Sequence, residues 1–144
     1  MPNSDLKSDY IQKKILQFCK KNKNSFAFKS MGAQNYLSCM KVSDAVIGNS
    51  SSGILEAPSL KTATVNIGDR QKGRVQANSI INSEHFHQKI YNSIKKSLSS
   101  SFKKKIKKTQ NPYYKKYTAA NITRIIEKKI IGKNFESKEF YDIK

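Results

Sequence analysis

The stretch AVIGNSSSGILE, residues 45–56, has the pattern of a strand, a tight polar turn and the start of a helix. Ala45–Ile47 is a short apolar run that ends at a glycine. Further strands are predicted at Ala63–Ile67 and Ser79–Ile81. Strands that alternate with helices favour right-handed β-α-β crossovers and therefore a parallel sheet. The sequence predicts an α/β protein with a Rossmann-like parallel sheet and helices on both faces.

Helices are predicted around these strands, because apolar residues recur at three- and four-residue spacing, as at Ile11, Ile15 and Phe18. The chain opens on a helix and has only about four short strands, whereas domains of this class usually begin with a central strand. We therefore expect part of the sheet to be missing. The predicted helices are about Ser8–Lys21, Gln34–Lys41, a helix that Ile54–Ala57 opens, Glu84–Ser99, Phe102–Lys108 and Thr118–Ile131.

The chain of 144 residues is strongly basic, with 28 Lys and Arg against 10 Asp and Glu and a formal net charge of +18. Such an excess points to nucleic acid or an anionic membrane. However, the arginines are only Arg70, Arg74 and Arg124, and lysines are scattered over almost every predicted helix face. This distribution favours solvated helix faces over a nucleic-acid-binding stripe. Nucleic acid is therefore not the favoured partner.

Membrane, redox and metal chemistry have weak support. No apolar run is long enough for a membrane helix and the N-terminus lacks a signal peptide, so we expect a cytoplasmic protein without a membrane partner. Cys19 and Cys39 lie in apolar helical patterns, which predicts reduced core thiols. His85 and His87 would diverge on a helix, so no metal site is predicted, and no cofactor is expected.

The turn after the first predicted strand has phosphate-binding chemistry. Ser50, Ser51, Ser52 and Gly53 bring backbone N–H groups and hydroxyl donors to the positive end of a predicted helix, at the sheet edge where open α/β sheets bind ligands. Glu56 lies about one and a half turns into that helix, within reach of a ribose diol. The alternative is an ordinary serine-rich helix cap beside a solvated glutamate.

The loop GDRQKGR, residues 68–74, follows the next predicted strand at the same edge. Its two glycines let it bend close to a ligand, and Arg70, Lys72 and Arg74 supply cationic donors for a diphosphate. The alternative is a solvated basic loop. Two adjacent strand ends with phosphate-compatible chemistry together favour a nucleotide-diphosphate site.

The segment GNSSSGILEAPSLKTATVNIGDRQKGRVQANSII, residues 48–81, resembles the signature of hydrolysing UDP-N-acetylglucosamine 2-epimerases, including those that serve sialic and legionaminic acid synthesis. The resemblance implies the C-terminal half of a glycosyltransferase-B fold, truncated at its N-terminal end. Residues 1–132 would form a partial UDP-binding domain, and residues 133–144 a polar tail. Three flanking segments are also similar to the family: Pro2-Asn3-Ser4-Asp5, Tyr36-Leu37-Ser38 and Asn111-Pro112-Tyr113.

The resemblance also implies a ligand, a UDP-sugar, and a partner, a separate N-terminal epimerase domain. The family's reaction removes the C2 proton of the sugar, expels UDP to form a glycal and hydrates the glycal to the manno product. The motifs that carry its catalytic carboxylates and histidine are not found in this sequence, so we expect the isolated chain to be inactive. By position, the family's UDP-binding roles pass to Ser50, Ser51, Ser52 and Gly53 for the diphosphate, Glu56 for the ribose, Arg74 for the phosphate charge, Arg70 with Gly73 for the second loop, and Tyr36 for the uracil.

Two alternatives stay open from the sequence. One is a basic nucleic-acid-binding protein, whose binding would weaken steeply with salt and be indifferent to UDP. The other is a non-functional gene remnant that binds no ligand, because half a sheet folds poorly by itself.

Overall fold

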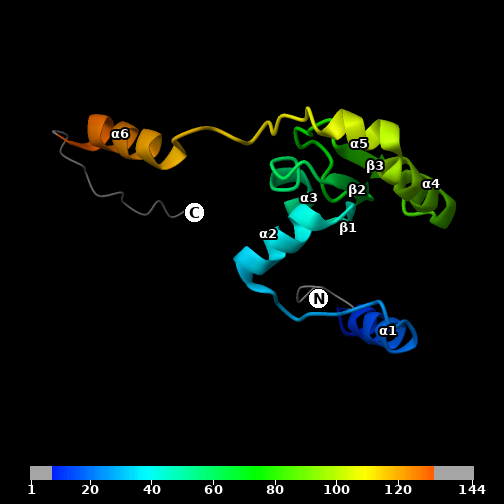
Figure 1. The fold of residues 1–144 in the computed structure, drawn as a ribbon. Helices are drawn as coiled ribbons and strands as arrows, with labels where there is room; N and C mark the ends of the chain where they lie inside the picture. The colour runs from blue at the N-terminus through cyan, green and yellow to red at the C-terminus, as the bar shows by residue number, and fades with distance from the viewer. Residues whose placement is uncertain (1–7, 132–144) are drawn as a thin grey trace, which may run out of the picture. The chain divides into compact units, whose positions relative to one another are not determined.

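The computed structural model describes residues 8–131, and every structural statement below refers to this part of the chain (Figure 1). The flanking segment at residues 2–5 and the tail predicted at residues 133–144 lie outside the described residues. The elements, in chain order, are α1 (Ser8–Lys21), α2 (Gly32–Val42), β1 (Ala45–Gly48), α3 (Ser52–Leu55), β2 (Ala63–Ile67), β3 (Ile80–Ser83), α4 (His87–Leu98), α5 (Ser100–Ile106) and α6 (Thr118–Ile130).

The three strands of the described chain form a parallel sheet in the order β1-β2-β3. Ala45 pairs with Ala63 at one end of the sheet, and Asn66 of β2 pairs with Asn82 of β3 near the other. The connection from β1 to β2 contains α3, whereas residues 68–79 join β2 to β3 through turns without a helix. The prediction of a parallel sheet is confirmed, with three strands where about four short ones were expected.

Helices cover both faces of the sheet, because successive residues of a strand point to opposite sides. Ala63 of β2 packs against Phe102 and Ile106 of α5. On the other face, the hydroxyl of the next residue, Thr64, donates a hydrogen bond of 2.9 Å to the carbonyl of Gly53 in α3. The chain therefore has the predicted Rossmann-like α/β architecture, with β2 as its buried central strand.

Helix α3 is much shorter than the sequence indicated. It begins at Ser52 and ends at Leu55, so Glu56 lies at its C-terminal cap instead of inside it. Pro58 disfavours the helical conformation at the preceding residue, and consecutive turns follow up to Lys61, whose φ is +58°. The side-chain amide of Asn111 closes this region by donating to the Leu55 carbonyl at 2.7 Å.

Helix α4 begins later than predicted. Glu84, His85 and Phe86 precede it, because Phe86 has an extended conformation at the N-terminal cap. The prediction that Glu84 occupies the first turn was therefore wrong. Apolar side chains at both ends of the predicted helix are largely solvent-accessible, since the exposed fraction is 58% for Phe86 and 45% for Leu98.

The two cysteines lie outside the core. Both are free thiols; Cys39 is exposed and Cys19 is half-buried. Their predicted place in the core was wrong, because the faces of α1 and α2 that carry them are not covered within the described residues. None of the helices in residues 8–131 combines the length and the apolar character needed to cross a bilayer.

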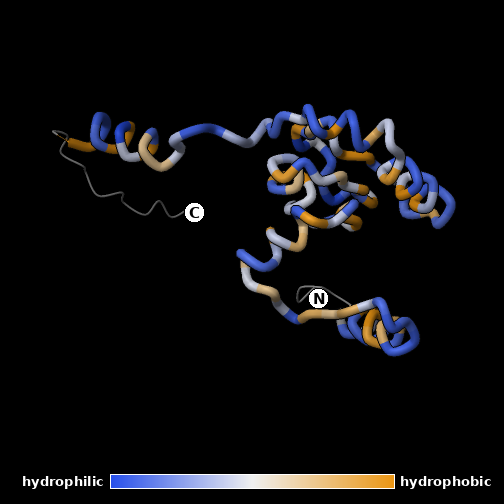
Figure 2. The backbone as a smooth tube through the Cα atoms, viewed as in Figure 1, coloured by the Kyte–Doolittle hydropathy of each residue, from blue (hydrophilic) through white to orange (hydrophobic). Residues whose placement is uncertain are grey.

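The chain divides into two compact units, with the division between Pro112 and Tyr113. The described part of the second unit contains α6, on which apolar and polar residues alternate along the helix (Figure 2). Its isoleucines are at least 45% exposed in this structure: Ile122, Ile125, Ile126 and Ile130. The amphipathic pattern thus correctly predicted a helix here, although no residue of α6 is buried.

Candidate functional site

The turn after β1 is organised by its own serines. The Ser50 hydroxyl oxygen accepts the backbone N–H of Ser52 at 3.3 Å, and the N–H of Gly53 donates to the Ser50 carbonyl at 3.2 Å. Ser50 is exposed and Ser51 is half-buried. Within residues 8–131 the hydroxyl groups of Ser50 and Ser51 donate no hydrogen bond. Two hydroxyl protons are therefore available for an anionic ligand at the carboxyl end of the sheet.

The short α3 corrects one part of the predicted phosphate site. A helix of four residues, Ser52–Leu55, contains too few aligned peptide units for the dipole on which the prediction relied. Gly53 serves packing instead, since a Cβ atom at this residue would lie 2.7 Å from Cγ2 of Thr64. The predicted phosphate site therefore has hydroxyl and turn N–H donors but no helix terminus.

Three of the predicted residues form one hydrogen-bonded chain. The Tyr36 hydroxyl, from α2, donates to the Ser52 hydroxyl oxygen at 2.9 Å. The Ser52 hydroxyl donates to the Glu56 carboxylate. Ser52 is buried, whereas Glu56 is exposed and Tyr36 is 37% exposed. The structure thus brings together Tyr36, Ser52 and Glu56, which lie up to 20 residues apart in the sequence.

The loop after β2 is fastened to the serine turn. The Asn49 carbonyl accepts a hydrogen bond from the Arg70 guanidinium at 3.2 Å and another from the Gln71 side-chain amide at 2.8 Å. Gln71 is only 2% exposed. Arg70 was predicted as a site residue from the sequence, whereas Gln71 and Asn49 were not. An uncharged amide between Arg70 and Lys72 was the available signal for a buried residue in this basic loop.

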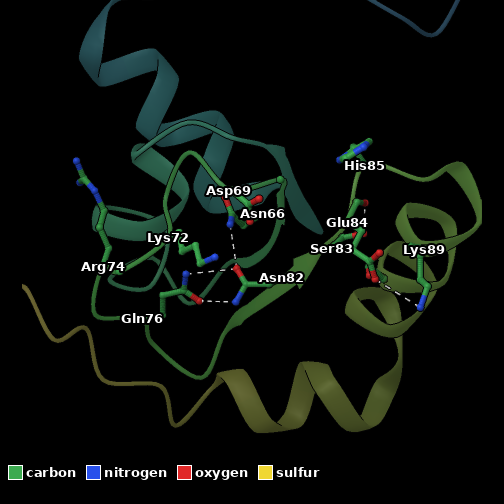
Figure 3. Close-up of a pocket in the computed structure, with 13 residues that line it drawn as sticks. Asn66, Asp69, Lys72, Arg74, Gln76, Asn82, Ser83, Glu84, His85 and Lys89 are labelled. Atoms are coloured by element: carbon green, nitrogen blue, oxygen red, sulfur yellow. Dashed lines mark hydrogen bonds and ion pairs between the residues drawn. The ribbon is translucent and has the colours of Figure 1, made fainter.

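A cavity of about 860 Å³ lies over the carboxyl ends of β2 and β3 (Figure 3). Amide side chains form a network in it: Asn66 donates to Asn82 at 2.9 Å, and Asn82 donates to Gln76 at 2.8 Å. In Figure 3 the Lys72 side chain points toward this network, whereas Arg74 extends away from it. Of the residues to which the sequence assigned UDP-binding roles, Arg74, Gly73 and Lys72 of the second loop line this cavity.

Two buried oxygen atoms near these loops are unmatched. Oδ1 of Asn66 and Oε1 of Gln71 have no hydrogen-bond partner within the described residues. Leaving such an atom unpaired costs about 1–3 kcal/mol. The carboxyl edge of the sheet therefore carries both uncommitted hydroxyl donors at the serine turn and unmatched acceptors beneath the second loop.

The two histidines differ in their local structure. His85 precedes α4 and its ring stacks on Phe86 with 4.9 Å between ring centroids, while His87 is the first residue of the helix. The expectation that both lie on a helix was wrong, because the helix begins later. Across residues 8–131, His, Cys, Asp and Glu form no group of three placed to hold a metal ion.

Comparison with known proteins identifies the family. The sequence profile of the UDP-N-acetylglucosamine 2-epimerases matches residues 1–127. The chain belongs to this family. The matched range includes the serine turn, Glu56 and the loop at residues 68–74, so the family resemblance read from these motifs is confirmed.

Three relatives show how much of a longer protein this epimerase-family chain represents. A polysialic acid biosynthesis protein of Escherichia coli is 44% identical over 141 residues, which are 98% of this chain and 36% of that protein. A hydrolysing GDP/UDP-N,N'-diacetylbacillosamine 2-epimerase of Campylobacter jejuni is 48% identical over 83 residues, covering 57% of this chain and 22% of its own length. A UDP-N-acetylglucosamine 2-epimerase of Neisseria meningitidis is 30% identical over 98 residues, or 68% and 26% of the two chains. The epimerase-family chain thus spans little more than a third of these relatives at most.

Proposed function

We propose that this epimerase-family chain is the UDP-binding portion of a hydrolysing UDP-N-acetylglucosamine 2-epimerase. The parent reaction would convert UDP-N-acetylglucosamine and water to N-acetylmannosamine and UDP, or carry out the related reaction of a UDP-diacetamido sugar. The observation that carries this proposal is the pairing of two hydroxyl donors, Ser50 and Ser51, with a cationic loop at adjacent strand ends. A curated relative whose name specifies a hydrolysing 2-epimerase supports the same reaction class.

Each part of UDP has a matching group at the serine turn or in the segments that contact it. Ser50 and Ser51 donate their hydroxyl protons to the diphosphate, and the Arg70 guanidinium, 3.2 Å from the Asn49 carbonyl, places positive charge beside it. The Glu56 carboxylate accepts hydrogen bonds from the ribose hydroxyls. The partly exposed ring of Tyr36 faces the uracil. The roles of Ser50, Ser51, Glu56 and Tyr36 are those that the family resemblance implies, whereas the resemblance gives Arg70 a part in shaping the second loop.

The cavity over β2 and β3 suits the hydrophilic part of the same ligand. Lys72 and Arg74 add positive charge there, and neither forms an ion pair within residues 8–131. The amides of Asn66, Gln76 and Asn82 offer donors for hydroxyl and phosphate oxygens. We therefore assign the neutralisation of phosphate charge to Arg74 from this side of the second loop.

Catalysis is assigned to residues outside this chain. The family reaction needs carboxylates and a histidine for proton transfer at C2, and the chain covers at most 36% of the three relatives described above. We propose that the isolated chain binds UDP without epimerising a UDP-sugar, and that a separate N-terminal epimerase domain supplies the missing groups. The cytoplasmic location stays a prediction.

The test is a calorimetric titration of the 144-residue chain with UDP at several salt concentrations. We expect saturable binding of one UDP per chain, which the Ser51→Ala and Glu56→Ala variants weaken about tenfold. A single-stranded oligonucleotide serves as the competitor. Oligonucleotide binding that falls steeply with salt and ignores UDP, with no UDP binding, would contradict the proposal and favour the nucleic-acid alternative. Formation of N-acetylmannosamine by the chain alone would contradict its assigned inactivity.

A further inference from the structure

The hydroxyl of Ser52 is engaged on both sides. Its oxygen accepts a hydrogen bond from the Tyr36 hydroxyl at 2.9 Å, and its proton is donated to the Glu56 carboxylate. A serine hydroxyl has a single proton to donate. Since Ser52 is 9% exposed and its proton points to Glu56, this group is not presented to a diphosphate in the way that the Ser50 and Ser51 hydroxyls are.

We propose that Ser52 is a positioning residue that, through the chain Tyr36–Ser52–Glu56, holds the Glu56 carboxylate ready for the ribose hydroxyls. The inference rests on the proposed function, because the role of Glu56 comes from there. It differs from the role that the family resemblance implied for Ser52, which was to receive the diphosphate. The ligand group that the Glu56 carboxylate binds at the end of this chain of hydrogen bonds is the ribose diol.

The Glu56 side chain needs a neighbouring group that keeps it in one conformation. It is exposed, it lies beyond the last residue of α3, and it forms no ion pair within residues 8–131. A glutamate side chain loses substantial rotamer freedom when it is fixed in one conformation. This loss of entropy weakens ligand binding unless the side chain is already fixed in the free protein. The hydrogen bond from Ser52 fixes the carboxylate before a ligand arrives. Affinity for the ribose diol therefore depends on Ser52.

Ser52 is itself held in place by the fold. Its N–H donates to Ser50, and the adjacent Gly53 packs so closely on Thr64 that a side chain does not fit between them. Tyr36 is anchored through α2, because the carbonyl of Met40 in that helix accepts the Thr62 hydroxyl at 3.0 Å. Ser52 is thus held through Gly53 against Thr64 of β2, and Tyr36 is held through α2 by Thr62, which immediately precedes β2. The arrangement is a rigid support for one exposed carboxylate.

The experiment compares UDP with 2′-deoxy-UDP, which lacks one of the two ribose hydroxyls. We expect the unchanged chain to prefer UDP about tenfold, and Glu56→Gln to remove most of this preference. Ser52→Ala and Tyr36→Phe should lower the preference to about threefold, because each variant weakens the affinity for UDP more than the affinity for 2′-deoxy-UDP. Ser52→Thr keeps the hydroxyl and should restore the preference. Ser51→Ala is the matched control, because loss of a phosphate donor weakens both nucleotides equally.

The outcomes separate the two proposals. If the unchanged chain binds neither nucleotide, the proposed function fails and this inference fails with it. If the chain binds UDP and Ser52→Ala weakens UDP and 2′-deoxy-UDP by the same factor, Ser52 is a phosphate ligand and the inference alone is overturned. If Ser52→Ala does not fold, Tyr36→Phe decides: an unchanged preference for UDP in that variant overturns the inference.

Discussion

The turn after β1, residues 49–56, and the loop after β2, residues 68–74, occupy neighbouring strand ends, yet they use their polar groups differently. In the turn, Ser50 stabilises its own backbone, and Ser52 binds Tyr36 and Glu56. In the loop, Gln71 fastens the two segments together while the charges of Lys72 and Arg74 line a cavity. The turn therefore supplies a fixed arrangement of donors and acceptors, and the loop supplies charge.

The strongest prediction is that replacing Gly53 of the turn destabilises the chain more than replacing Gly73 of the loop. Gly53→Ala places a Cβ atom 2.7 Å from Thr64 Cγ2, so we expect unfolding free energy to fall by about 2–3 kcal/mol in urea denaturation. Gly73→Ala meets no atom within 4 Å but requires a left-handed φ of +82°, which should cost about 1 kcal/mol. The double variant Gly53→Ala with Thr64→Ser removes the clashing methyl group and should recover much of the loss. Equal losses of unfolding free energy in the two variants would contradict this difference between the turn and the loop.

The next effect concerns the donors of the serine turn. Because Ser50 and Ser51 have uncommitted hydroxyl protons, Ser51→Ala should weaken UDP binding about tenfold at constant fold stability, since a hydrogen bond to a charged group contributes about 1.5–3 kcal/mol. Ser50→Ala should weaken UDP binding and also destabilise the chain, as its oxygen accepts the Ser52 N–H. Calorimetric titration and thermal melting together distinguish the two serines. Identical behaviour of both variants would show that the turn does not depend on Ser50.

Gln71 tests the connection between the segments. Gln71→Leu removes the 2.8 Å hydrogen bond to Asn49 and also the unmatched Oε1 atom, so the two changes partly offset each other. We expect a loss of about 1 kcal/mol in unfolding free energy and a several-fold weaker affinity for UDP. Gln71→Glu buries a charge and should destabilise the chain more. A leucine variant with unchanged stability and UDP affinity would mean that the loop does not support the turn.

The smallest effect concerns the charge of the second loop. Replacing Lys72 and Arg74 by glutamine should weaken UDP binding about threefold at low salt, and the difference should shrink as salt is added, because exposed charges are screened. The matched control replaces two exposed lysines of the α5 region, Lys104 and Lys107, with the same loss of net charge. A control variant that weakens UDP binding equally would attribute the effect to the overall charge of +18 and not to the cavity.

Much of the fold could be predicted because local patterns dictate it. Strand β2 was predicted with the observed bounds, Ala63–Ile67, since five residues between turns form a buried run. Helix α1 was also predicted with its observed bounds, from apolar spacing alone. The start of α4 and the length of α3 were not, because Phe86 and the residues around Pro58 adopt conformations that periodicity does not encode.

The candidate site could also be predicted only in part. The serine turn and the basic loop could be selected from the sequence because their residue types are typical of phosphate-binding sites. The tie from Gln71 to Asn49 was not visible, since it joins residues 22 positions apart. The amide network depends on register: Asn66 meets Asn82 only because β2 and β3 are parallel and pair these two positions.

Residue types and short-range spacing were enough to predict the family, the alternation of strands and helices, and the residues with phosphate-compatible chemistry. Which of these polar groups can still bind a ligand depends on the folded structure. A hydroxyl has one proton, and whether Ser52 donates it to Glu56 or offers it to a ligand depends on the distance between side chains that the fold brings together. Hydrogen bonding is short-ranged, so that choice is made by packing.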